Sequence, residues 1–150
     1  MSQVNPDEPV GYTLKRAATA LRRAMDTELR VHDLTVPQYA CLKLLAQHPG
    51  LTNARLAPRA FVSRQAMHQL LTGLRASGLV AGDGQGRKER FTITEHGLQR
   101  LAGASATVAA IEERMLSTVD LARRQRLQAD LNECVRALEH AEPAATAPNA

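Results

Sequence analysis

A group of polar side chains follows Ser63 at the spacing of one helix face. Serine favours the N-cap of a helix, and the apolar residues behind it recur at i, i+3, i+4 and i+7, which predicts one buried face: Met67, Leu70, Leu71 and Leu74. The opposite face carries the side chains Arg64, Gln65, His68 and Gln69. Arginine can bridge guanine O6 and N7, and glutamine can bridge adenine N6 and N7. This pattern indicates a helix suited to the base edges of a DNA major groove.

A second set of cations follows a glycine-rich segment. The runs 79–81 and 90–93 are strand-like and flank Gly82–Gly86, which predicts a β-hairpin with a glycine-rich tip. Its cations are Arg87, Lys88 and Arg90, which we expect to contact phosphates or to enter a narrow minor groove. The glycine spacing does not fit a GxGxxG phosphate loop, and a strand follows where that motif needs a helix. A flexible turn is therefore the better interpretation.

Three capping residues divide the middle of the chain into helices. Thr35 with Gln38 forms a capping box, and Thr52 and Ser63 are further N-cap candidates. They predict helices over 35–48, 52–58 and 63–77, with Pro58 at or near the end of the second. Followed by the hairpin, these helices make a helix-turn-helix with a wing, in which the second helix of the turn enters the major groove.

Longer amphipathic helices flank this lobe. Apolar residues recur every three or four positions over 12–32, 94–117 and 121–140, which predicts one helix in each range. Their apolar stripes exceed what one small lobe can cover, so we expect a second copy of the chain to bury them. The ends, 1–9 and 142–150, are polar or rich in alanine and proline, and we expect them to be flexible.

Composition and charge agree with one DNA-binding unit. A chain of 150 residues with 44% apolar content suits a single domain with one core. The net charge is +4 and the pI about 9.6. Between Thr52 and Gly97 seven Lys and Arg face three acids, so this third of the chain holds the whole positive excess. A localised surplus favours an anionic partner bound at one surface.

Other classes of function find little support in the sequence. Cys41 and Cys134 both lie in apolar helical patterns, and we expect buried, inert thiols in a protein of the cytoplasm. The five histidines are scattered, which argues against a zinc site, and no apolar segment is long enough to cross a bilayer. No nucleophile, base and orienting group fall into a catalytic pattern. We expect neither an enzyme nor a bound cofactor.

The order of motifs over residues 34–97 resembles the MarR (multiple antibiotic resistance regulator) family. The motifs are Leu34-Thr35-x-x-Gln38-Tyr39-x-x-Leu42-x-x-Leu45, Thr52-x-x-x-Leu56-Ala57, Val62-Ser63-Arg64-Gln65-x-Met67-x-x-Leu70-Leu71-x-x-Leu74-x-x-x-Gly78-Leu79-Val80, Gly86-Arg87 and Ile93-Thr94-x-x-Gly97. Each motif alone is common, but their succession is specific.

The resemblance implies a mostly α fold with a winged helix-turn-helix and a small β-hairpin wing. It implies one domain over 1–150, with the DNA-binding lobe at 34–97 and dimerisation helices at 10–33 and 98–141. It further implies a homodimer that binds a near-palindromic operator in double-stranded DNA. Arg87 matches the family's wing-tip arginine, but Gln85 stands where the family has a bracing Asp. Asp83 and Glu89 are the alternative braces.

The resemblance also implies a repressor that a small phenolic or other aromatic acid releases from DNA. Tyr12, Arg16, His32 and Tyr39 are the ligand candidates, since they lie on the two helices that would line such a cleft. The alternative for a tyrosine on an amphipathic helix is a place in the core or in an interface. The alternative function is a winged-helix module that binds protein or RNA without operator specificity, because fold alone does not decide function.

Overall fold

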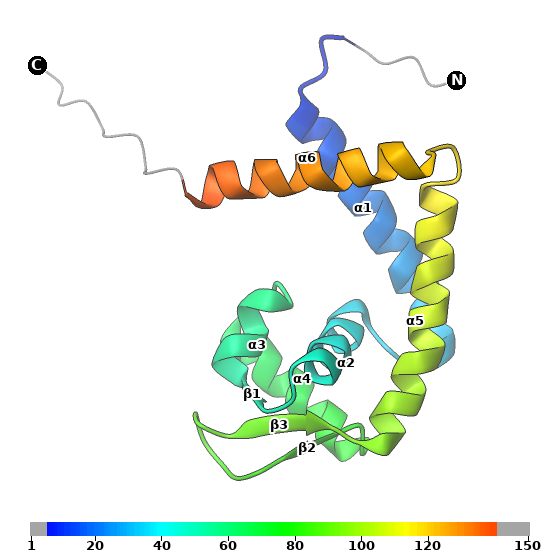
Figure 1. The fold of residues 1–150 in the computed structure, drawn as a ribbon. Helices are drawn as coiled ribbons and strands as arrows, with labels where there is room; N and C mark the ends of the chain where they lie inside the picture. The colour runs from blue at the N-terminus through cyan, green and yellow to red at the C-terminus, as the bar shows by residue number, and fades with distance from the viewer. Residues whose placement is uncertain (1–5, 141–150) are drawn as a thin grey trace, which may run out of the picture. The chain divides into compact units, whose positions relative to one another are not determined.

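The computed structural model describes residues 6–140, so of the predicted flexible ends at 1–9 and 142–150 only residues 6–9 are described. The chain forms two compact units, one through Glu112 and the other from Glu113 onward. The first unit holds the predicted winged helix-turn-helix, and Figure 1 shows its helices around a small sheet.

The first unit begins with α1 (Val10–Glu28), which continues as a 3-10 turn, η1 (Leu29–His32). This confirms the helix predicted over 12–32, with a tighter last turn. The apolar stripe is buried only at its C-terminal end, where Leu29 is fully enclosed, while Leu14 near the start is exposed. The N-terminal part of the predicted stripe, Leu14 and Ala18, is therefore exposed, while Met25 is partly buried against the core.

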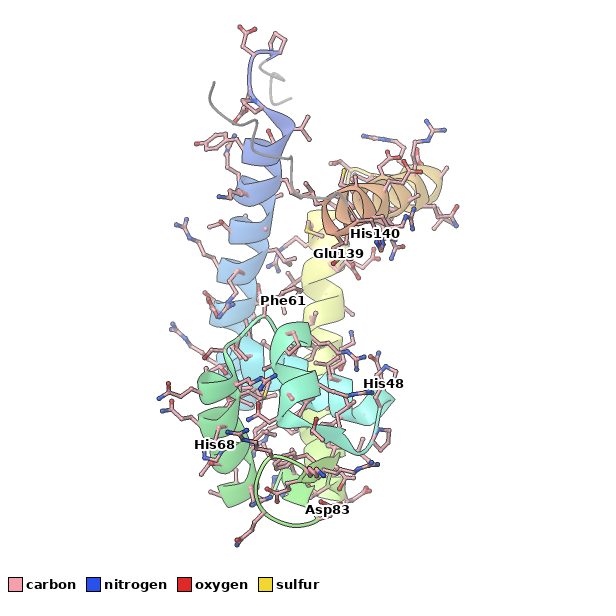
Figure 2. The ribbon with its side chains drawn as sticks, turned by 90° about the vertical axis from the view of Figure 1, so that its left-hand side faces the viewer. His48, Phe61, His68, Asp83, Glu139 and His140 are labelled. Atoms are coloured by element: carbon pink, nitrogen blue, oxygen red, sulfur yellow. The ribbon has the colours of Figure 1, made fainter. Side chains whose placement is uncertain are left out.

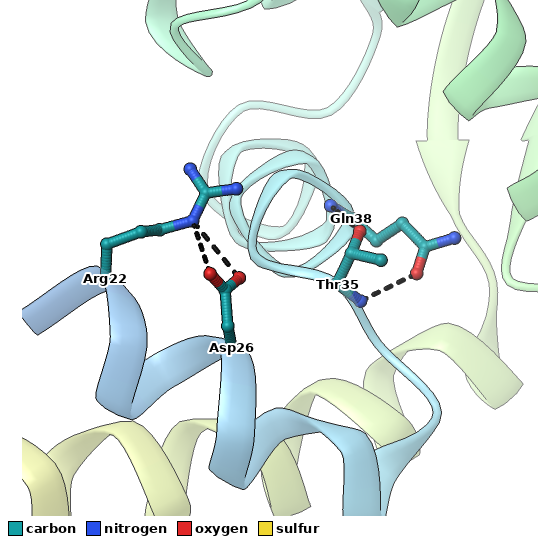
Figure 3. A network of polar contacts seen from close by, with 4 residues as sticks. All are labelled: Arg22, Asp26, Thr35 and Gln38. Atoms are coloured by element: carbon teal, nitrogen blue, oxygen red, sulfur yellow. Dashed lines mark hydrogen bonds and ion pairs between the residues drawn. The ribbon is translucent and has the colours of Figure 1, made fainter. Parts of the chain in front are cut away.

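α2 (Val36–Gln47) begins at the predicted capping box. The backbone N–H of Gln38 donates to Thr35 Oγ1 at 3.3 Å, and the backbone N–H of Thr35 donates to Gln38 Oε1 at 2.9 Å. Figure 3 shows the second of these bonds beside an exposed ion pair on α1, in which Arg22 Nε lies 3.1 Å from Asp26 Oδ1. The capping box satisfies two backbone donors that the first turn of a helix leaves free.

The helix-turn-helix consists of α3 (Asn53–Arg59) and α4 (Arg64–Ala76). Ser63 caps α4 as predicted, because its Oγ accepts the Ala66 N–H at 3.1 Å. Thr52 holds the N-cap position of α3, but its side chain accepts no capping hydrogen bond, so that detail of the prediction is wrong. Pro58 lies in the last turn of α3 as expected.

Phe61 forms the turn between α3 and α4. Its φ is +58°, a left-handed conformation that residues other than glycine seldom adopt, and its side chain is 94% exposed. Figure 2 shows it at the end of the lobe away from the hairpin loop that carries Asp83.

A three-stranded antiparallel sheet follows the order β1-β3-β2. The predicted hairpin is present as β2 (Val80–Gly82) and β3 (Arg90–Ile93). The additional strand β1 (Leu51–Thr52) was not predicted, and it pairs Leu51 with Phe91. This pairing attaches the base of the wing to the segment that leads into α3.

The core lies between α2, α3, α4 and the sheet. Its largest fully buried side chains come from α2, α3, α4, η1 and the segment between α4 and β2: Leu29, Leu42, Leu45, Leu56, Met67, Leu74 and Leu79. Burying each leucine or methionine stabilises the fold by about 1.5–3 kcal/mol. The same packing fixes α4 with its apolar face inward and its polar face outward.

α5 (Glu95–Met115) starts where Thr94 Oγ1 accepts the Gly97 N–H at 3.1 Å. In the second unit Arg124 joins the end of α5 to α6 (Leu121–Glu139), donating to the carbonyls of Leu116 and Val119 and to Glu113 Oε1 at 2.7–3.0 Å. The last carbonyl groups of a helix have no partner within the helix, and Arg124 supplies donors to two carbonyls that follow α5.

α6 has no buried residue among those described, and its apolar stripe is exposed: Leu127, Leu131, Val135 and Leu138. Cys134 is exposed as well, so its predicted burial is wrong. The helix predicted over 121–140 is present. Helical periodicity places the Cys134 thiol on one face of α6 but does not show what covers that face. Cys41, on α2, is fully buried as predicted.

Candidate nucleic-acid interface

The polar face of α4 is open at its N-terminal end. Arg64, Gln65, His68 and Gln69 are exposed, while Met67 between them is fully buried. Within residues 6–140 the side chains of Arg64, Gln65 and Gln69 have no hydrogen-bond or ion-pair partner. Because the first turn of a helix carries a partial positive charge, this end of α4 suits a negatively charged ligand.

A groove joins the start of α4 to the wing. Three elements line it: Asn53 and Ala54 of α3, Arg64, Gln65 and His68 of α4, and Gly86, Arg87, Glu89 and Phe91 of the hairpin. Figure 2 shows His68 on α4 and Asp83 on the hairpin loop at the same end of this unit. The groove thus brings together four predicted DNA contacts that are up to 23 positions apart in the sequence, from Arg64 to Arg87.

The remaining predicted contacts lie around this groove. Ser63 is the N-cap of α4, and Gln69 and Lys88 are exposed but do not line the groove. Arg90 is the first residue of β3 and is paired with Thr52, so it lies at the base of the wing. Arg87 and Lys88 are therefore the two cations of the hairpin tip.

Both proposed braces for Arg87 are wrong. Asp83 Oδ1 accepts the backbone N–H of Arg90 at 2.8 Å, and the carboxylate of Glu89 pairs with Arg75 of α4. Arg87 itself has no ion-pair or hydrogen-bond partner in the part of the chain that the structure describes. The Asp83 carboxylate thus closes the hairpin by a bond to the Arg90 backbone. Sequence position alone showed that Asp83 is near Arg87, but not that its carboxylate binds a backbone N–H.

Sequence reasoning missed Asn53, which connects the two helices of the turn. Its Nδ2 donates to the Arg64 carbonyl at 3.2 Å, although the two residues are 11 positions apart. Its Oδ1 is buried and has no partner among the described residues. Asn53 therefore holds the first residue of α4 against the start of α3, next to the groove.

The four candidate ligand residues do not form one site in the described chain. Tyr12 and Arg16 lie one turn apart near the start of α1, where Arg16 pairs with Glu8 at 3.4 Å. His32 is at the opposite end of that helix, and its Nε2 is 2.7 Å from Thr107 Oγ1 of α5. Tyr39 lies on α2 and is buried in the hydrophobic core, with Lys43 Nζ 5.8 Å from its ring centre.

The described residues also bear on cysteine reactivity, metal binding and membrane insertion. Burial raises the pKa of the Cys41 thiol from 9.0 to about 12, which leaves it protonated and unreactive at neutral pH. Among residues 6–140 no group of three His, Cys, Asp or Glu is placed to hold a metal ion. None of the described helices is long and apolar enough to cross a bilayer.

Comparison with known proteins decides the family. The sequence model described as MarR family matches residues 32–88. The chain is 38% identical over 114 residues to the HTH-type transcriptional repressor Rv2887 of Mycobacterium tuberculosis, an alignment that covers 74% of this chain and 82% of that protein. The chain belongs to the MarR family.

Solved structures of MarR proteins share the fold. The DNA complex of the M. tuberculosis MarR family protein Rv2887 superposes with a TM-score of 0.74 at 34% identity, covering 85% of this chain and 98% of that one. The complex of Rv2887 with salicylic acid gives a TM-score of 0.71 at 33% identity, covering 87% and 99%. These matches confirm the mostly α, winged-helix fold that the sequence predicted.

Proposed function

We propose that this MarR-family protein is a transcriptional repressor that binds a specific site in double-stranded DNA. The observation that carries the proposal is the groove in which Arg64, Gln65 and His68 of α4 face the same space as Arg87 of the wing. An exposed helix N-terminus with Arg and Gln can read base edges, while wing cations neutralise phosphates. The relative Rv2887 has been crystallised with DNA, which supports the same partner here.

We further propose that the protein acts as a homodimer in the cytoplasm, as one domain over 1–150. Exposed apolar residues recur along the predicted dimerisation segments: Val10, Tyr12, Leu14, Leu121, Leu127, Leu131, Val135 and Leu138. Side chains of this size on one monomer call for a covering surface. A twofold dimer would present two copies of α4 to a near-palindromic operator.

The effector we propose is a small aromatic acid. Rv2887 has been crystallised with salicylic acid and with p-aminosalicylic acid, which supports this chemical class. Arg16 could pair with the carboxylate and His32 could donate a hydrogen bond, but they lie at opposite ends of the α1–η1 segment. Salicylic acid should release the repressor from DNA, and the one variant of Arg16→Ala and His32→Ala that raises the required concentration should show which end of this segment holds the acid.

The direct experiment is a gel shift with the duplex next to the protein's own gene, with a random duplex as competitor. Repression at an operator predicts that the promoter duplex binds at least about 1,000-fold more tightly than the random one. Equal affinity for both would favour the alternative, a winged-helix protein- or RNA-interaction module. We propose regulation as the function in place of catalysis, because the relatives that the chain matches are transcriptional repressors.

A further inference from the structure

The base of the wing is tied to the last turns of α4 by one ion pair. Arg75 Nη2 donates to Glu89 Oε1, joining residues that are 14 positions apart. The Glu89 side chain is only 10% exposed, whereas that of Arg75 is 45% exposed. The Arg75 guanidinium carbon also lies 5.3 Å from the centre of the Phe91 ring, within the range of a cation–π contact.

Gly82 leaves room for this ion pair. A Cβ built on Gly82 would overlap the guanidinium of Arg75 and the carboxylate of Glu89. Gly82 is paired with Phe91 across the hairpin, so the ion pair lies over the strand that leads into the wing. The three side chains and the glycine form what we call the wing clip: Arg75, Gly82, Glu89 and Phe91.

The wing clip links the hairpin loop to α4, the proposed recognition helix, through side chains. Asp83, at the other end of the loop, bonds only to the Arg90 backbone within the same hairpin. Arg87 and Lys88 at the tip have no partner within residues 6–140. The position of these two cations relative to α4 therefore depends on Glu89, the neighbour of Lys88.

We propose that Arg75 and Glu89 are positioning residues that hold the wing at a fixed distance from the N-terminal face of α4. Binding would otherwise have to immobilise the loop, at a cost in conformational entropy. The clip lets Arg87 and Lys88 reach the DNA backbone while Arg64 occupies the groove. This inference rests on the proposed DNA-binding function and assigns a role to two residues that the sequence did not predict as DNA contacts.

For Glu89→Gln, a positioning role and a simple charge effect predict opposite changes in DNA affinity. Removing an acid from the wing makes it more positive, and electrostatics alone would tighten DNA binding. Loss of positioning should instead weaken operator binding about three- to tenfold, the size of coupling expected between residues in one network. The matched control is Asp26→Asn, which makes the same charge change and breaks the exposed Arg22–Asp26 pair on α1. It should leave DNA affinity within about twofold of wild type.

A double-mutant cycle tests whether the clip acts through the tip. Lys88→Ala should lose much of its effect in the Glu89→Gln background, because the displaced tip no longer places Lys88 at the backbone. The slope of log affinity against log salt should become shallower for Glu89→Gln, by no more than about one, although neither phosphate-binding cation is removed. A purely structural pair would leave the effects additive and the slope unchanged.

Gly82→Ala is a second variant that alters no charge. It should displace the same two side chains and weaken binding in the same direction as Glu89→Gln, with circular dichroism confirming that both variants fold. Tighter binding by Glu89→Gln, or additive effects with Lys88→Ala, would overturn the positioning role while wild-type binding to the operator stands. Failure of the wild-type protein to prefer the promoter duplex would instead overturn the proposed function.

Discussion

Ser63→Ala should destabilise the recognition helix by about 1 kcal/mol, within the range measured for the loss of a helix cap. The substitution removes one hydroxyl, and with it the 3.1 Å bond from the Ala66 N–H. The Met67 N–H still donates to the Ser63 carbonyl at 2.9 Å. Ser63 and Ala66 are exposed, so water can reach the freed donor, and we do not expect the upper end of that range.

Thr52→Val is the matched control, since it also removes one hydroxyl from an N-cap residue. Thr52 has the same extended backbone as Ser63, with ψ of 163° against 160°, but its side chain makes no capping bond. Urea unfolding at fixed protein concentration should show the loss of about 1 kcal/mol in the free energy of unfolding for Ser63→Ala, and thermal unfolding should show a fall in Tm of about 2–4 °C. For Thr52→Val the free energy of unfolding should change by less than about 0.5 kcal/mol. Equal losses in both variants would refute the assignment of the cap.

Other regions of the chain give further predictions. In the native protein a maleimide should label Cys41, which is fully buried in the core, only on unfolding, as followed by mass spectrometry. Since folding raises the Cys41 pKa from 9.0 to about 12, its thiol favours the folded state below pH 9, and this contribution should fall as the pH rises from 9 to 12 in alkaline unfolding curves. Gly97→Ala should lower stability by about 1–3 kcal/mol, because a Cβ there would overlap the Leu79 carbonyl oxygen; an unchanged Tm would contradict this close approach. Arg124→Ala should speed hydrogen exchange at the α5–α6 turn, and unaltered exchange would show that its three bonds add no local stability.

The elements that the sequence predicted correctly depend on local patterns. The capping box at Thr35 and the cap at Ser63 each involve residues within three positions, and both bonds are present. The buried face of α4 follows from helical periodicity, and Met67, Leu71 and Leu74 are buried as predicted. Local signals were also sufficient to place Arg64, Gln65 and His68 on one exposed face, with the groove confirming that they lie together.

The features that sequence reasoning missed depend on pairing between distant residues. The two-residue strand β1 is too short to show a period, and it exists only because Leu51 pairs with Phe91. The partner of Glu89 is 14 positions away on a helix, so the search for an acid beside Arg87 gave the wrong brace. Cys134 shows a related difficulty, because its apolar pattern does not say whether the covering surface belongs to the same chain.

We propose that α4 reads the base sequence while the cations of the wing tip neutralise backbone charge. Competition binding of the promoter duplex and a random duplex, over a salt series, tests it with Arg64→Ala and Lys88→Ala. Arg64→Ala should cost about 1–3 kcal/mol on the promoter duplex and much less on random DNA. Lys88→Ala should weaken both duplexes alike and lower the salt slope by about one per contact removed. A uniform loss for Arg64→Ala, together with an unchanged salt slope for Lys88→Ala, would contradict this division of roles.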